Sequence, residues 1–109
     1  MGESAKRRVP RVEPVVAHGV RYEVVRGARS QGFKQNGGVI AAIEVASGKA
    51  LWTLLIYTTQ YDEHEEADVQ DVFITEMKIS TDGKTLMIKN EAHKSFVVRL
   101  ADRSVSNLN

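Results

Sequence analysis

The sequence predicts an all-β fold, an antiparallel meander of about six to seven strands that forms a small sandwich or partial barrel. Three observations lead to this prediction. Short segments alternate apolar and polar residues with the period of two that half-buried strands show. Turn residues, above all Asp82-Gly83, separate these segments at short spacing. Helical periodicity is nearly absent, and only residues 63–71 have the composition for a single helical turn.

Residues 1–17 are predicted to form a disordered, flexible N-terminal arm, and residues 18–109 a single all-β domain. The arm contains both prolines of the chain, Pro10 and Pro14, together with four basic residues and few large apolar side chains. Such a composition provides no face to bury. A chain of 109 residues has room for one hydrophobic core.

The first strand of the domain is expected to begin at Val20. One face of this strand carries three apolar or aromatic side chains, those of Val20, Tyr22 and Val24. A long loop is expected next, over residues 27–38, because four of these twelve residues are glycine.

Residues 39–45 and 50–59 are rich in β-branched and aromatic side chains and are apolar on both faces, so both are expected to be central strands. The short segment 46–49 contains a glycine that suits a tight turn, which predicts antiparallel pairing of the two strands. Trp52 and Tyr57 are separated by an odd number of positions and should lie on opposite faces.

The C-terminal part predicts a further hairpin. Asp82-Gly83 is a preferred two-residue hairpin loop and should join residues 72–79 to residues 86–88. The first of these strands is expected to place one set of side chains on a shared face, namely Phe73, Thr75, Met77 and Ile79. A strand around residues 96–100 follows, and the last short apolar position is Val105.

Two segments resemble repeats of β-propellers. Residues 42–52 have an acid, a Ser-Gly turn and Trp52 at the spacing of the quinoprotein (PQQ-type) repeat, although Glu44 stands where that family prefers Asp. Residues 80–100 begin like the Ser-Pro-Asp-Gly-Lys hairpin of surface-layer and WD-type propellers, with Thr81 in place of proline. The resemblance implies blade-like hairpins with Trp52 packed between layers, and no cofactor ligand. A closed propeller needs about four or more blades, which 109 residues cannot supply.

The segment 61–71 is the most acidic part of the chain and holds six of its 14 acidic residues beside His64. Oxygen-rich loops of this kind attract hard cations such as calcium or manganese. The alternative metal site would use Asp62, His64, Asp68 and Asp71. Because the spacing lacks the alternating ligands and central glycine of a calcium loop, a solvated acidic loop is the favoured interpretation.

Charge is segregated along the chain. Residues 1–34 hold eight basic and three acidic residues, a net charge of +5, whereas the remainder carries −4. Within the basic part, the loop over residues 26–34 combines cations, glycines and one aromatic ring, which suits phosphate binding and base stacking. The candidate anion-binding residues are Arg26, Arg29, Phe33 and Lys34. No recognised nucleic-acid motif accompanies them, and nucleic acid is not favoured as a partner.

The sequence predicts no catalytic residue and no cofactor, because neither a nucleophile beside a histidine nor a recognisable carboxylate pair is present. The absence of cysteine excludes disulfides and fits a cytoplasmic protein. No apolar segment approaches the roughly 20 residues of a membrane helix. The function is therefore expected to be non-enzymatic, either self-association or binding of a protein partner through the sheet. Trp52 and Tyr57 are the candidate core or interface residues, and polyanion binding is the alternative.

Overall fold

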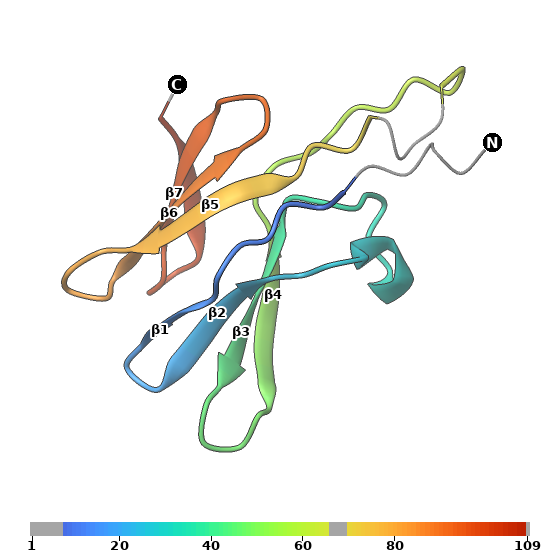
Figure 1. Ribbon diagram of the computed structural model, residues 1–109. Helices are drawn as coiled ribbons and strands as arrows, with labels where there is room; N and C mark the ends of the chain where they lie inside the picture. The colour runs from blue at the N-terminus through green and yellow to red at the C-terminus, as the bar shows by residue number, and fades with distance from the viewer. Residues whose placement is uncertain (1–7, 66–69, 109) are drawn as a thin grey trace.

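The computed structural model describes residues 8–65 and 70–108, and this part of the chain is almost entirely β-structure (Figure 1). It contains one short 3-10 helix, η2 (Ala28–Gln31), and eight strands. The strands are β1 (Val15–Ala17), β2 (Val20–Val24), β3 (Val39–Glu44), β4 (Ala50–Leu55), β5 (Ile74–Ile79), β6 (Thr85–Asn90), β7 (Ser95–Arg99) and β8 (Ser104–Asn107).

The strands form two antiparallel sheets of four, each built from consecutive strands. Sheet A has the order β1-β2-β3-β4 and sheet B the order β5-β6-β7-β8. No strand pairing joins the two sheets within the described residues, although β1 lies beside β5 (Figure 1). The all-β antiparallel class is thus confirmed, but there is no closed barrel, and the strands number eight rather than six or seven.

The main core lies between the sheets and takes side chains from both of them. Because alternate residues of a strand point to opposite faces, each sheet contributes every second residue of its central strands. The buried members are Tyr22, Ile40, Ala42, Ile56, Ile74, Met77, Leu86, Ile88, Phe96 and Val98. A second, smaller cluster covers the other face of β3 and consists of Val25, Ala28, Val39 and Ala41. This second cluster explains why β3 is apolar on both faces.

The folded part of the chain begins earlier than the sequence predicts. Residues Val15–Ala17, which the sequence places in a flexible arm, form β1 and pair antiparallel with β2. Val12 also packs against the main core. A strand of three residues is too short to show a period of two, and the two nearby prolines conceal it further.

A bulge in β5 changes which of its side chains face the core. The pairing with β6 shifts register between Ile74 and Glu76, so that Ile74, Met77 and Ile79 contact the core. Thr75 is exposed, and its predicted place on the same face as Met77 and Ile79 is wrong. One extra residue in a strand reverses the direction of every side chain on one side of it, and apolar alternation does not reveal such an insertion.

The strand β4 is an edge strand, whereas the sequence predicts a central one. Its alternation also ends after Ile56, because Ile56 and the next residue, Tyr57, both pack against the main core. Tyr57 therefore packs against the main core, as Trp52 does, and the expected separation of these two residues onto opposite faces is wrong. The predicted antiparallel pairing of β3 with β4 is confirmed.

The turn around Asp82 joins β5 to β6 as predicted, but it is longer than two residues. The Ser80 N–H donates to the Thr85 carbonyl over 2.9 Å, which leaves four residues in the loop. The Asp82 carboxylate accepts hydrogen bonds from the Ser80 hydroxyl (2.7 Å) and the Lys84 N–H (3.0 Å). These bonds favour the ionised form and lower the pKa of Asp82.

The buried side chain of Gln35 connects the loop before β3 to the segment after β4 by hydrogen bonds. The Gln35 Nε2 donates to the carbonyl oxygens of Gly37 (3.0 Å) and Tyr57 (2.9 Å). The Gln35 Oε1 accepts the Thr59 N–H over 2.9 Å. The side chain thus satisfies three polar groups of the main chain that would otherwise be difficult to pair in a buried place.

Gly37 lies directly against the chain that leads into β5. A β-carbon placed on Gly37 would lie 2.5 Å from the Val72 carbonyl oxygen, and its φ of 87° is disfavoured for other residues. Gly48, in the β3–β4 turn, also has a positive φ, of 74°, but nothing lies within 4 Å of its β-carbon position.

We therefore expect Gly37→Ala to lower the free energy of unfolding by several kcal/mol, against about 1 kcal/mol for Gly48→Ala. Both variants place an alanine in the left-handed conformation, which lowers the free energy of unfolding. Only Gly37→Ala also pushes the start of β3 away from Val72. Urea denaturation of the two variants and the wild type measures the difference. Equal losses would contradict the close packing at Gly37.

Candidate interaction surface

The outward face of β4 is apolar and open to solvent. Leu51 is 47% exposed and Leu55 is 38% exposed, with Thr53 between them on the same face. Val45, in the turn that precedes β4, is exposed as well. The inward residues Trp52 and Leu54 pack against the core, so the exposure of Thr53 and Leu55 follows from the period of two, whereas Leu51 lies at a shift of register in the pairing with β3. The second cluster, under η2, covers β3 and does not include these leucines.

The outer edge of β4 also presents main-chain groups. The Ile56 N–H donates to the Gly38 carbonyl over 2.7 Å, and hydrogen bonding alternates along an antiparallel pair. Leu54, opposite Ile40, therefore bonds to β3. Thr53 and Leu55 direct their N–H and C=O groups away from β3. No strand pairs with this edge within residues 8–65 and 70–108.

The strand β4 has neither of the two residue types that often protect an edge strand, a charge or a proline, although its pairing with β3 shifts register at a bulge between Ala50 and Trp52. It reads Ala-Leu-Trp-Thr-Leu-Leu and contains no charge and no proline. Natural edge strands are commonly short or carry lysine, proline or a bulge that prevents pairing with another chain. One of the two edge strands of sheet B, β8, is shorter and mostly polar, with the sequence Ser-Val-Ser-Asn. Of these two edges, that of β4 is the better suited to bind another strand.

Trp52 lies on the inward side of β4, at the margin of the core. It packs against the core on the same side as Leu54 and Ile56, as the sequence predicts, but it is only half-buried. Its ring is tilted against that of Tyr22, with 6.0 Å between the centroids. The guanidinium carbon of Arg103, in the β7–β8 turn, lies 5.6 Å from the centroid of the Trp52 ring. The cation and the two sheets together hold the indole in place.

We expect Trp52→Ala to cost about 2 to 3 kcal/mol of stability, less than the roughly 3 to 5 kcal/mol of a fully buried tryptophan. Removing the ring takes apolar contacts from both sheets and leaves Arg103 without its aromatic partner. The measurement is the urea midpoint of the variant. An unchanged midpoint would show that Trp52 contributes nothing to the core and serves only at the surface.

Tyr57 is the second candidate core or interface residue, and both its ring and its hydroxyl make contacts within the protein. Its ring stacks on Phe96 with 5.3 Å between the centroids, and its hydroxyl donates to the Val72 carbonyl over 2.6 Å. Burial raises the pKa of Tyr57 far above its ordinary value of 10.0, and the nearby Glu91 carboxylate raises it further. The phenol thus stays protonated and keeps its hydrogen bond.

This raised pKa predicts loss of stability at alkaline pH. Above the ordinary pKa the unfolded tyrosine ionises while the folded one stays neutral, so the stabilisation is complete below pH 10 and falls as the pH rises. We expect Tyr57→Phe to be less stable at neutral pH but to lose stability less steeply above pH 10. Denaturant midpoints from pH 8 to pH 11 provide the test. Parallel curves for the two proteins would contradict it.

The candidate anion-binding residues lie on and around η2. Arg26 and Lys34 are exposed. Arg29 is exposed too, and its guanidinium carbon lies 4.9 Å from the centroid of the Tyr61 ring. Phe33 is half-buried and packs against the second cluster. The cations are thus accessible, whereas the ring expected to stack on a base is used for packing.

The candidate metal ligands are dispersed between surface and interior. The Asp62 carboxylate accepts the His64 N–H over 2.8 Å, in an exposed turn. Asp71 is buried and accepts the Tyr61 hydroxyl over 2.5 Å. Asp68 lies outside the described residues. Among the residues that the structure describes, no three acidic or histidine side chains come together as a metal-binding group.

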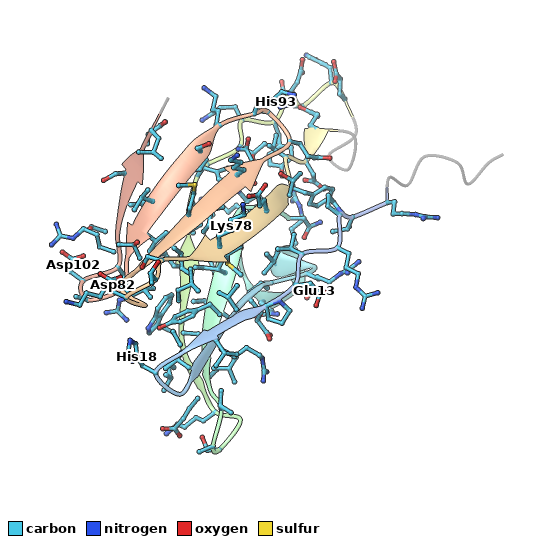
Figure 2. All side chains as sticks on the ribbon, turned by 60° about the vertical axis from the view of Figure 1, so that its left-hand side comes forward. Glu13, His18, Lys78, Asp82, His93 and Asp102 are labelled. Carbon is cyan, nitrogen blue, oxygen red and sulfur yellow. The ribbon has the colours of Figure 1, made fainter. Side chains whose placement is uncertain are left out.

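A groove of about 600 Å³ opens where the ends of the two sheets meet. Its lining includes His18 of the β1–β2 turn and Asp82 of the β5–β6 turn, which face each other in Figure 2. The His18 Nε2 lies 3.2 Å from the Asp82 carbonyl oxygen. Tyr22 and Lys84 also line the groove. The contact joins turns that are 64 positions apart in sequence, so local patterns could not predict it.

A comparison with protein-family models finds no match to the chain, and a search of curated proteins finds no similar sequence. No helix of the described residues is long and apolar enough to cross a membrane.

Proposed function

We propose that the chain is a non-enzymatic interaction module that self-associates or binds a protein partner through β4 and the outward face of sheet A. The observation that carries this proposal is the pair of exposed leucines, Leu51 and Leu55, on an edge strand without charge. Contact with another chain would remove their apolar surface from water and pair the open main-chain groups of the strand.

The resemblance of residues 42–52 and 80–100 to propeller repeats stays a hypothesis. Under it, each four-stranded sheet corresponds to one blade, and blades are units that bury their faces against neighbouring blades. Association of this chain with a further sheet is consistent with that hypothesis. The proposal itself depends only on the exposed surface of β4.

We expect the wild-type protein to associate as its concentration rises, and Leu55→Lys to weaken this association at least tenfold. A lysine in place of Leu55 removes apolar area and introduces a charge that must be desolvated in the interface. Sedimentation velocity over a hundredfold range of concentration measures both proteins.

The matched control is Met87→Lys. Met87 is 40% exposed, almost the same fraction as Leu55, but lies on β6 in sheet B. This variant should associate like the wild type. A wild-type protein that stays monomeric throughout, in the absence of another protein, would remove self-association from the proposal. Equal effects of the two lysines would move the interface away from β4.

Polyanion binding is the alternative function, and the exposure of Arg26, Arg29 and Lys34 favours it. Phosphate contacts would give an affinity for a generic nucleic acid that falls steeply with salt. Fluorescence anisotropy with a labelled single strand at two salt concentrations distinguishes the alternatives. Salt-dependent binding that is lost in Arg26→Ala with Lys34→Ala would establish the alternative, and its absence would leave β4 as the functional surface.

A further inference from the structure

The groove between the ends of the two sheets is bordered by three turns. Its lining includes His18 of the β1–β2 turn, Asp82 and Lys84 of the β5–β6 turn, and Leu100 of the β7–β8 turn. The Leu100 N–H donates to the Lys84 carbonyl over 3.0 Å, which joins the last two turns. The His18 ring packs on Gly83, where an added β-carbon would lie 2.6 Å from His18 Nε2. The three turns thus hold one another in place and give the groove a defined shape.

The side chain of Tyr22 reaches the groove from β2. Tyr22 is only 7% exposed, and its ring packs in the main core. Buried tyrosine hydroxyls usually find a hydrogen-bond partner, but that of Tyr22 has none within residues 8–65 and 70–108. Burial raises the pKa of Tyr22, so its phenol stays protonated and can donate a hydrogen bond.

The Tyr22 hydroxyl is open to solvent rather than sealed in the core. Among the described residues, the only fully enclosed side-chain oxygen or nitrogen without a partner is Thr59 Oγ1. The Tyr22 oxygen is therefore accessible, and Tyr22 lines the groove. Its unused hydrogen bond is thus available to a molecule that occupies the groove.

The groove carries a positive charge. Its described lining has two permanent cations, Lys84 and Arg99, against the single carboxylate of Asp82. Neither cation forms an ion pair within the part of the chain that the structure describes. The Asp82 carboxylate already accepts hydrogen bonds from the Ser80 hydroxyl (2.7 Å) and the Lys84 N–H (3.0 Å). The negative charge is thus used by the turn, whereas the two positive charges stay available to a ligand.

The rest of the wall is mainly apolar. Leu100 packs against the main core, and the Tyr22 ring and the Ala101 methyl group line the groove beside it. The volume of about 600 Å³ lies within the usual range for small-molecule sites. An oxyanion attached to an apolar body would match both parts of the lining. A nucleic-acid strand would need a longer track of cations than these two.

We infer that the groove binds a small organic anion, a phosphate or a carboxylate carried on an apolar body. Lys84 and the Tyr22 hydroxyl hold the oxyanion by charge-assisted hydrogen bonds, and Arg99 lies at the rim. The apolar body lies against Leu100 and the Tyr22 ring. This inference goes beyond the proposed function and uses none of the outward residues of β4.

Phenyl phosphate and benzoate are the two probes, and the one that binds more tightly identifies the oxyanion. Trp52 is the only tryptophan, and its ring centroid lies 6.0 Å from that of Tyr22, so its emission reports on the groove. We expect a saturable change in emission with a Kd of about 1 mM, typical of a ligand of about ten non-hydrogen atoms. Phenol and inorganic phosphate, the two halves of phenyl phosphate, should each bind at least tenfold more weakly.

Two substitutions locate the bound anion. Lys84→Gln removes the cation, Tyr22→Phe removes only the hydroxyl oxygen, and each should weaken binding at least fivefold. Because this hydroxyl has no partner among the described residues, Tyr22→Phe should keep the urea midpoint of the wild type. The matched control is Lys89→Gln, which removes an exposed lysine from the outward face of β6 and should bind like the wild type.

Each other outcome contradicts a stated part of the inference. The absence of saturable binding by both probes would overturn it outright. Equal weakening by Lys84→Gln and Lys89→Gln would show a general response to charge in place of a site. Inorganic phosphate that binds as tightly as phenyl phosphate would exclude the apolar body. A Tyr22→Phe variant with wild-type affinity, or with a lowered urea midpoint, would show that the hydroxyl does not serve the groove.

Discussion

The structure depends on the burial of β3 on both faces. Toward sheet B, Ile40 and Ala42 are completely buried in the main core. On the other side, Val39 and Ala41 lie under the segment that contains η2. In the order of sheet A, β3 lies between β2 and β4, which leaves β4 at the margin. The segment that contains η2 covers β3, and Leu51 and Leu55 of β4 are not part of the cluster beneath it. These two leucines therefore stay exposed.

The connection between the sheets is held by polar contacts rather than by regular pairing. Gln35 joins the loop before β3 to Tyr57 and Thr59, while the Tyr57 hydroxyl reaches the main chain just before β5. These bonds fix the direction in which the chain leaves β4. Without them the long connection to β5 would have no defined path, and the core faces of the two sheets would not be aligned.

Much of the fold could be predicted from the sequence, because strands and turns are local. The alternation at Val20 to Val24 and the turn at residues 46–49 correctly located β2 and the β3–β4 hairpin. The errors arose where the alternation is interrupted, by an inserted residue in β5 and, after β4, by two consecutive residues, Ile56 and Tyr57, that both pack against the core. Edge and centre cannot be distinguished by composition alone, since the apolar run of β4 is also typical of a covered strand. For the same reason the sequence pointed to Trp52 and Tyr57 and did not single out Leu51, Thr53 and Leu55.

The consecutive order of strands in each sheet has a consequence for the folding reaction. Every strand pair in sheets A and B joins neighbours in the sequence, so each sheet can form by closing short loops, apart from the longer segment 25–38 between β2 and β3. Loop closure is the main entropic barrier in β-proteins, and sheets with such low contact order form quickly. The slow event is then the docking of the two preformed sheets across the connection between β4 and β5. The transition state should accordingly depend more on the contacts between Tyr22 and sheet B than on any one hairpin.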